Sequence, residues 1–139
     1  MTQIVRQLMT PKPKTVDAGE PVANVAKVMR DQAVGAVVVV HGERVKGIVT
    51  DRDIAIRAVA ERRDPWNTRV GDITSEDVVS LSPEDPVNDA IELMRRHAVR
   101  RLPVVEGGKP VGIVSIGDLA QDRDPTSALA DISAAPANR

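Results

Sequence analysis

The chain of 139 residues lacks cysteine and contains almost no aromatic residues. Without thiols it can form no disulfide framework and no zinc–sulfur site, and no thiolate is available as a nucleophile. Trp66 is the single aromatic side chain, whereas valine occurs 22 times, so the core must be built from small branched and aliphatic side chains. This composition suits buried strands that are covered by helices.

An excess of one charge and long apolar runs are also absent. Lysine and arginine number 19 and aspartate and glutamate number 20, which gives a net charge of −1. Such a balance is not typical of proteins that bind nucleic acid by neutralising phosphates. The N-terminal residues lack the pattern of a signal peptide, and the longest apolar run, residues 33–40, is too short to cross a bilayer. We therefore expect a cytoplasmic protein that binds neither nucleic acid nor membranes.

The most informative feature that is present is an internal duplication. Residues 5–55, the first repeat, align without a gap with residues 70–120, the second repeat, at a constant offset of 65. Identities at this offset include Val5 and Val70, Pro21-Val22 and Pro86-Val87, Gly47-Ile48-Val49 and Gly112-Ile113-Val114, and Asp53 and Asp118.

The duplication predicts the domain organisation. We expect one domain at residues 1–64, a linker at 65–69 and a second domain at 70–123. The segment 124–139 is rich in Ala, Ser, Asp and Pro, and we expect it to be a disordered tail.

Each repeat predicts the order strand, helix, strand, strand, helix. Apolar residues recur at helical spacing behind Pro21 and Pro86, with Asp85 as a candidate N-cap, and each stripe predicts one buried helix face. The stripes are Val22, Val25, Ala26 and Met29, and Val87, Ala90, Ile91 and Met94. Valine-rich segments on either side of glycine turns at 41–44 and 106–109 predict two hairpins. The fold class is therefore α/β (α+β), with the same order of elements in both repeats.

A hydroxyl residue stands three positions before an aspartate at the end of each hairpin. Thr50 precedes Asp53, and Ser115 precedes Asp118. One interpretation is a capping box, in which the two side chains satisfy the amides at the start of the following helix. The other is a nucleotide site, because a helix start offers free amides and an aspartate can accept hydrogen bonds from ribose hydroxyls. The spacing alone does not separate these interpretations.

These motifs together resemble the CBS domains, whose tandem pairs are called Bateman modules. The resemblance covers about residues 5–122 and is carried by Gly47–Ile54, Gly112–Leu119 and Val99–Val105. The chain is also similar to small stand-alone bacterial CBS-pair proteins associated with stress responses. The resemblance implies two pseudo-symmetric CBS domains that bind an adenosine nucleotide in clefts between the repeats.

The resemblance also assigns roles to individual residues. It places the ribose on the aspartate, a phosphate on the preceding Ser or Thr, and the base in an apolar slot beside the strand that follows the first helix. The implied ribose and phosphate residues are Asp53, Asp118, Thr50 and Ser115. The implied slots comprise Gly35, Ala36, Val37, Leu102 and Pro103, closed by Thr15, Val16, Ser80 and Leu81.

The two implied sites differ in charge. Arg100 and Arg101 occupy the positions of Gly35 and Ala36, and in the family basic residues there often contact phosphates. The alternative is that two exposed arginines only keep a strand edge soluble. Val38 in the first repeat stands where the second has Pro103, so the first site departs from the family's pattern.

Other candidate sites are weaker. His41 and His97 are the only histidines and have no second ligand at metal spacing, so we expect no metal site. Trp66 is interpreted as a packing anchor between the halves or as a dimer contact, because nucleic-acid readers usually present several aromatics.

The sequence thus favours a regulatory module that binds AMP, ADP, ATP or a related adenosyl compound. We expect it to sense energy or metabolic state, to form a homodimer and to act on an unidentified protein target. No nucleophile, base and orienting group occur together, and no glycine-rich phosphate loop is present, so we expect no enzymatic activity. The alternative is a stress-associated dimeric scaffold whose clefts are empty or vestigial.

Overall fold

A computed structural model describes residues 3–74, 79–124 and 126–135. Its internal contacts divide the chain into two compact units. The first unit contains residues 14–74, and the second unit contains residues 3–13 together with the described residues from 79 onward. Within the described ranges, no helix is long and apolar enough to cross a membrane.

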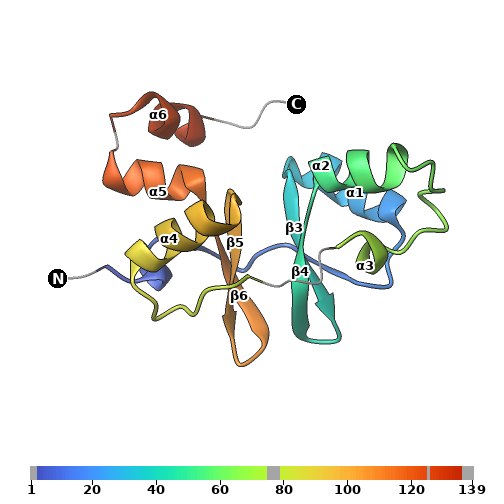
Figure 1. The fold of residues 1–139 in the computed structure, drawn as a ribbon, viewed down its shortest axis with the longest axis horizontal. Helices are drawn as coiled ribbons and strands as arrows, with labels where there is room; N and C mark the ends of the chain where they lie inside the picture. The colour runs from blue at the N-terminus through green and yellow to red at the C-terminus, as the bar shows by residue number, and fades with distance from the viewer. Residues whose placement is uncertain (1–2, 75–78, 125, 136–139) are drawn as a thin grey trace. The chain divides into compact units, whose positions relative to one another are not determined.

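The first unit contains most of the first repeat (Figure 1). Its elements are β2 (Thr15–Asp17), α1 (Val22–Gln32), β3 (Ala36–His41), β4 (Arg44–Thr50), α2 (Asp51–Ile54), the π-helical turn η2 (Ala55–Val59) and α3 (Val70–Ile73). Strand β2 pairs in parallel with β3, and β3 pairs antiparallel with β4. The predicted order of strand, helix, strand, strand and helix is confirmed.

The second unit repeats this plan. Its elements are the 3-10 turn η1 (Val5–Gln7), β1 (Thr10–Pro11), α4 (Val87–His97), β5 (Arg101–Glu106), β6 (Lys109–Ser115), α5 (Ile116–Arg123) and α6 (Ala128–Ala134). The sheet order is β1-β6-β5. The predicted early strand at Ser80-Leu81 is reduced to one parallel bridge between Leu81 and Val104, at the positions equivalent to Val16 and Val39.

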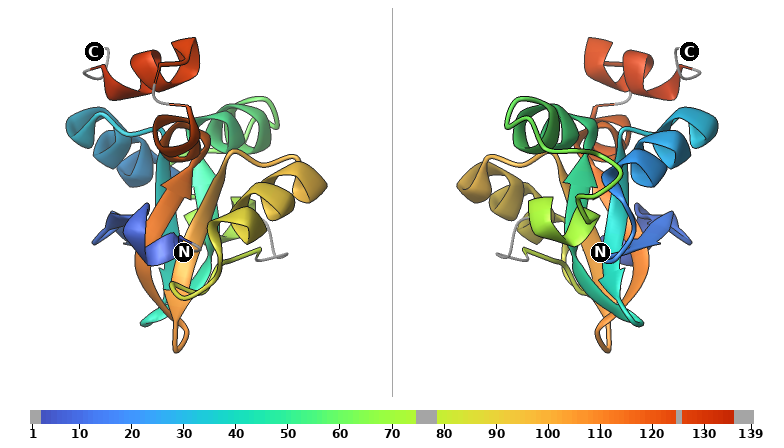
Figure 2. Two further views of the ribbon diagram at one scale, coloured as in Figure 1. Left: turned by 90° about the vertical axis from the view of Figure 1, so that its left-hand side faces the viewer. Right: turned by 90° about the vertical axis from the view of Figure 1, so that its right-hand side faces the viewer.

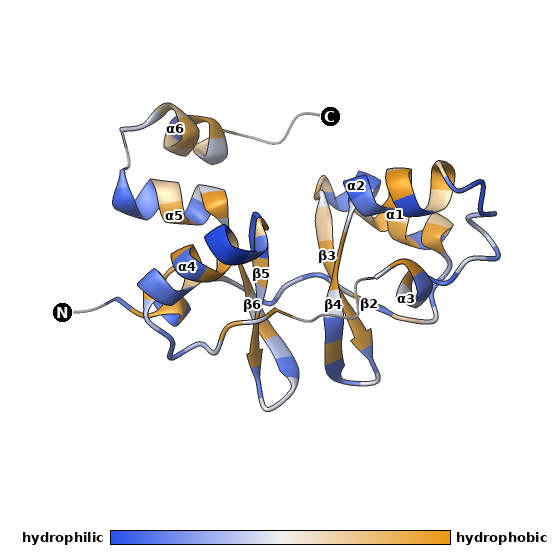
Figure 3. Ribbon diagram, in the orientation of Figure 1, coloured by the Kyte–Doolittle hydropathy of each residue, from blue (hydrophilic) through white to orange (hydrophobic). Residues whose placement is uncertain are grey.

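Each unit has its own apolar core, which the helix stripes predicted. In α1 the buried residues are Val22, Val25 and Met29, and in α4 they are Val87, Ala90 and Met94. These faces pack on the strands, where Val39, Val49, Val104 and Val114 are fully buried. Figure 3 shows the apolar residues of helices and strands in each unit.

The helix starts differ from one sequence expectation. Pro86 is the N-cap of α4, as Pro21 is of α1, and neither makes a side-chain cap bond. Asp85 is therefore not the N-cap. Its carboxylate instead accepts from the amide of Ser82 at 2.8 Å, which closes the turn before the helix.

The domain boundaries differ from the repeat boundaries at their N-terminal ends. We expected residues 3–13 in the first domain, but Val5, Leu8 and Met9 pack against the core of the second unit. Conversely, α3 packs in the first unit, where Val70 and Ile73 are buried. The reason is backbone pairing, because these segments satisfy amides and carbonyls beside the opposite repeat's first helix.

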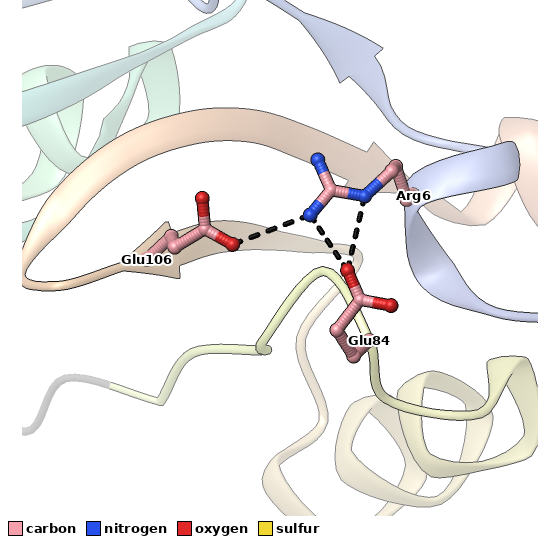
Figure 4. A network of polar contacts seen from close by, with 3 residues as sticks. All are labelled: Arg6, Glu84 and Glu106. Atoms are coloured by element: carbon pink, nitrogen blue, oxygen red, sulfur yellow. Dashed lines mark hydrogen bonds and ion pairs between the residues drawn. The ribbon is translucent and has the colours of Figure 1, made fainter.

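An ion-pair network links the N-terminal segment to the rest of the second unit (Figure 4). The Arg6 guanidinium donates to Glu84 at 2.6 Å and to Glu106 at 3.2 Å. The hydrogen bond to Glu84 is the main cause that raises the pKa of Arg6 above its usual value. All three side chains are about half exposed, so the network is open to solvent and salt.

Helix α6 lies in the segment for which the composition predicted a disordered tail. The Ser127 hydroxyl caps it by accepting from the amide of Ala130 at 3.0 Å. Alanine is the strongest helix former, and α6 packs against α5. The structure therefore corrects the tail prediction for residues 128–134, while residue 125 and residues 136–139 of that segment lie outside the described residues.

Candidate functional site

The hydroxyl and aspartate of each motif form a capping box. The Thr50 amide donates to Asp53 Oδ2 at 2.9 Å, and the Asp53 amide donates to Thr50 Oγ1 at 3.1 Å. Ser115 and Asp118 repeat both bonds at 2.8 and 3.1 Å. The structural interpretation of the motif is therefore realised at the start of α2 and of α5.

The cap leaves part of each aspartate available. Both bonds to Asp53 and Asp118 side chains use the Oδ2 atom, so Oδ1 takes no part in the cap. Both aspartates are only partly buried. A carboxylate has about four acceptor positions, so capping and ligand binding do not exclude one another.

Strand pairing brings the remaining motif residues to the same place. In the hairpin register Ala36 lies opposite Thr50, and Arg101 lies opposite Ser115. The Asp51 amide donates to the Gly35 carbonyl at 3.0 Å, and the Ile116 amide donates to the Arg100 carbonyl at 2.9 Å. Each helix start therefore adjoins the residue that precedes the first hairpin strand.

Several residues of the implied base slots are core residues instead of exposed ones. Val16, Val37, Leu81 and Leu102 all belong to the buried clusters of their units. Alternation along the strand turns these side chains towards the helices. In this arrangement these residues offer backbone atoms to a ligand, and not their side chains. Pro103 is buried as well.

The exposed candidates are polar. Thr15, Ser80, Arg100 and Arg101 are all exposed. Among the described residues neither arginine forms an ion pair. Gly35 and Ala36, at the same positions in the first repeat, are partly buried and carry no charge.

The first unit contains a pocket next to its helix start. It measures about 630 Å³, and its lining includes Gly35 and Asp51 together with residues from the end of α1. Two of these are Arg30 and Asp31, which form an ion pair at 2.9 Å. The hydrogen bond from Arg30 holds the pKa of Asp31 below its usual value. A smaller pocket of about 280 Å³ lies beside Thr15 and Val16.

Sequence reasoning did not find Arg30 and Asp31. They stand in the last turn of α1 and carry no motif, and the hairpin brings Asp51 beside the residues that follow this helix. The chain turns there at Ala33, whose positive φ of 54° ends the helix.

The histidines and the tryptophan are the remaining candidates from the sequence. His41 and His97 are exposed, and within the described part of the chain no three His, Cys, Asp or Glu side chains gather as metal ligands. Trp66 is 56% exposed, and the Lys27 ammonium lies 4.8 Å from its ring centroid. This distance is within the range of a cation–π contact, which joins Trp66 to α1.

Comparison with known families agrees with the repeat. The sequence model described as CBS domain matches residues 5–59 and again residues 70–123. The chain belongs to the CBS domain family. The two matches make it a CBS pair, and they coincide with the two copies of the strand and helix pattern described above.

Relatives of similar length share this CBS-pair organisation. The CBS domain-containing protein YhcV of Bacillus subtilis is 40% identical over 133 residues, which cover 93% of this chain and 94% of YhcV. Hypoxic response protein 1 of Mycobacterium tuberculosis is 29% identical over 117 residues, 84% of this chain and 82% of that protein.

One solved structure of the same fold contains ligands. The CBS domain pair of protein MJ0100, in complex with 5′-methylthioadenosine and S-adenosyl-L-methionine, superposes with a TM-score of 0.81. The superposition covers 91% of this chain and 100% of that chain at 21% identity, which shows a common fold.

Proposed function

We propose that this CBS pair is a regulatory module that binds an adenosine-containing ligand such as AMP, ADP or ATP. The observation that carries the proposal is the duplicated helix start, where a partly buried aspartate keeps one carboxylate oxygen outside its cap. Modules of this family generally bind adenosine ligands, and the MJ0100 pair holds two of them.

The second repeat is the stronger candidate site. Asp118 supplies an acceptor for ribose hydroxyls, and Ser115 lies opposite Arg101 in the hairpin. Arg100 joins the same corner through its carbonyl, and both guanidinium groups are exposed. Paired guanidinium groups beside a helix start favour a ligand with phosphates over a neutral nucleoside.

In the first repeat, Asp53 and Thr50 repeat the acceptor geometry, but the positions of Arg100 and Arg101 are taken by the uncharged Gly35 and Ala36. The adjoining pocket of about 630 Å³ is within the usual size range of small-molecule sites. We propose that this site binds its ligand more weakly, because Gly35 and Ala36 provide no positive charge.

The proposal includes no chemical step. The motifs contain no nucleophile activated by a base, and their hydroxyls are engaged in helix caps. We therefore propose that a bound nucleotide acts by changing how the CBS pair contacts an unidentified protein target, as a homodimer. Turnover of a nucleotide by highly purified protein, abolished by Asp118→Ala, would contradict this part of the proposal.

The decisive experiment combines native mass spectrometry with a thermal-shift screen. Mass spectrometry of freshly purified protein reports the number of subunits and any adenosine compound that co-purifies. A ligand present at a hundred times its dissociation constant should stabilise the fold by roughly 2.7 kcal/mol. Absence of any shift with AMP, ADP, ATP and S-adenosylmethionine would sink the proposal.

One alternative has an observation in its favour. The relative in Mycobacterium tuberculosis is named a hypoxic response protein, which suits a stress-associated scaffold that needs no ligand. The scaffold is favoured if the purified protein is a dimer that carries no nucleotide and if no added nucleotide shifts its melting temperature.

A further inference from the structure

Helix α6 lies beside α5 (Figure 2). At their contact the two helices approach one another more closely than a side chain at position 117 would allow. The contact is made at Gly117, which is buried. A Cβ atom on Gly117 would lie 2.5 Å from Oγ and 2.8 Å from Cβ of Ser133. The equivalent residue of the first repeat is Arg52, which is exposed. The missing side chain at position 117 therefore makes this contact possible in the second repeat.

This contact coincides with the proposed nucleotide site of the second repeat. Gly117 stands between Ser115 and Asp118, and the same Cβ position lies 3.6 Å from Ser115 Oγ. At the start of α5, the Ile116 amide bonds to the Arg100 carbonyl and the Asp118 amide bonds to Ser115 Oγ. Neither bond uses the amide of Gly117, and Gly117 itself is buried where Ser133 of α6 approaches it.

Helix α6 is held by few apolar contacts. It has seven residues, and Ala130 is the one that is buried. Its larger apolar side chains point outward, with Leu129 42% and Ile132 70% exposed, and Figure 3 shows apolar as well as polar turns on this helix. A helix this short is not stable in isolation, so α6 unfolds when it undocks, and the free energy required is small.

We propose that α6 is an autoinhibitory cover of the second-repeat site, a proposal that rests on the proposed function. Docked on Gly117, α6 places Ser133 where a nucleotide phosphate would reach the helix start. The ligand binds only the undocked state, so its apparent affinity is its intrinsic affinity reduced by the undocked fraction. Binding in turn releases the segment that carries Leu129 and Ile132.

The test uses full-length protein in an Asp53→Asn background, which weakens the first-repeat site and keeps a cap acceptor. Ala130→Gln places a large side chain in the buried face of α6 and undocks it. Ala128→Gln makes the same change on the exposed face and is the matched control. Gly117→Ala is a second way to undock α6, from the α5 side. Hydrogen exchange of the α6 amides reports docking, and calorimetry with ATP reports binding.

We expect Ala130→Gln to speed exchange in α6 and to strengthen ATP binding by about fivefold or more, with Ala128→Gln unchanged in both. Gly117→Ala should also speed exchange in α6. Faster exchange in Ala130→Gln with unchanged or weaker ATP binding would overturn the cover alone. Amide exchange in α6 of the parent that is already as fast as in Ala130→Gln and Gly117→Ala would also overturn the cover, because α6 would then not be docked in the parent. ATP binding by none of the variants would overturn the proposed function, and the cover with it.

Discussion

Val5 and Val70 stand 65 positions apart in the sequence and occupy equivalent places in opposite units. The Val5 amide donates to the Asp85 carbonyl at 2.8 Å, and the Val70 amide donates to the Glu20 carbonyl at 2.8 Å. Both side chains are almost fully buried, at 1% and 0% exposure. Each repeat therefore provides the N-terminal piece that completes the core of the other repeat's unit.

The first prediction concerns this exchange. Val5→Ala and Val70→Ala should each lower the free energy of unfolding by about 2 kcal/mol, because each removes two buried methyl groups and leaves a cavity. Chemical denaturation measures the change. Val59→Ala, at a position that is 67% exposed, is the control and should stay within about 0.5 kcal/mol of the parent. A Val5→Ala variant as stable as the control would show that the N-terminal segment does not complete the core.

The second prediction concerns the network of Arg6 with Glu84 and Glu106. Arg6→Gln should lower the melting temperature slightly in low salt, and the difference should shrink at high salt, because these exposed charges are screened. Arg30→Gln removes an exposed guanidinium that pairs with its chain neighbour Asp31, and it serves as the control. A loss of stability in Arg6→Gln that is independent of salt would show that packing matters more than charge.

The third prediction separates the cap from the ligand site. Asp118→Asn keeps an oxygen that can accept from the Ser115 amide, so we expect nearly unchanged stability. It loses the carboxylate, so nucleotide affinity should fall by about 1.5–3 kcal/mol. Asp118→Ala should lose this affinity and, in addition, about 1 kcal/mol of stability through the cap. Calorimetry and denaturation on both variants measure the two effects, and full affinity in Asp118→Asn would place the ribose elsewhere.

The fourth prediction concerns Arg100 and Arg101. Replacing both with Gln should weaken ATP binding more than adenosine binding, because the guanidinium groups contact phosphates and not the nucleoside. Titration of each ligand against the parent and the double variant measures the ratio. Equal losses for ATP and adenosine would rule out a phosphate role for the arginines.

The elements that the sequence predicted are those governed by local periodicity. The stripes behind Pro21 and Pro86 required one buried helix face, and the glycine turns closed both hairpins. The Ser/Thr and Asp spacing predicted both possible roles, and the cap is the one that the coordinates contain. Whether the same residues also bind a nucleotide stays a prediction.

The features that escaped prediction depend on contacts between distant parts of the chain. Nothing local in Val5 or Val70 indicates which core each one enters, because both repeats offer the same pattern. The pocket beside Arg30 and Asp31 is complete only once the hairpin has brought Asp51 to Gly35. The sequence did not reveal helix α6, because alanine and serine in a short segment are compatible with a disordered tail as well as with a capped helix. The close contact that Gly117 permits favours the helix.

The place of residues 3–13 in the second unit sets an order of assembly during synthesis. These residues leave the ribosome before the first unit does, yet the segments that they pair with, β6 and the turn before α4, are made much later. The first unit, by contrast, has all its parts once Ile73 has emerged. The N-terminal segment therefore stays unpaired while the first unit folds. The second unit can complete its sheet only after β6 has been translated.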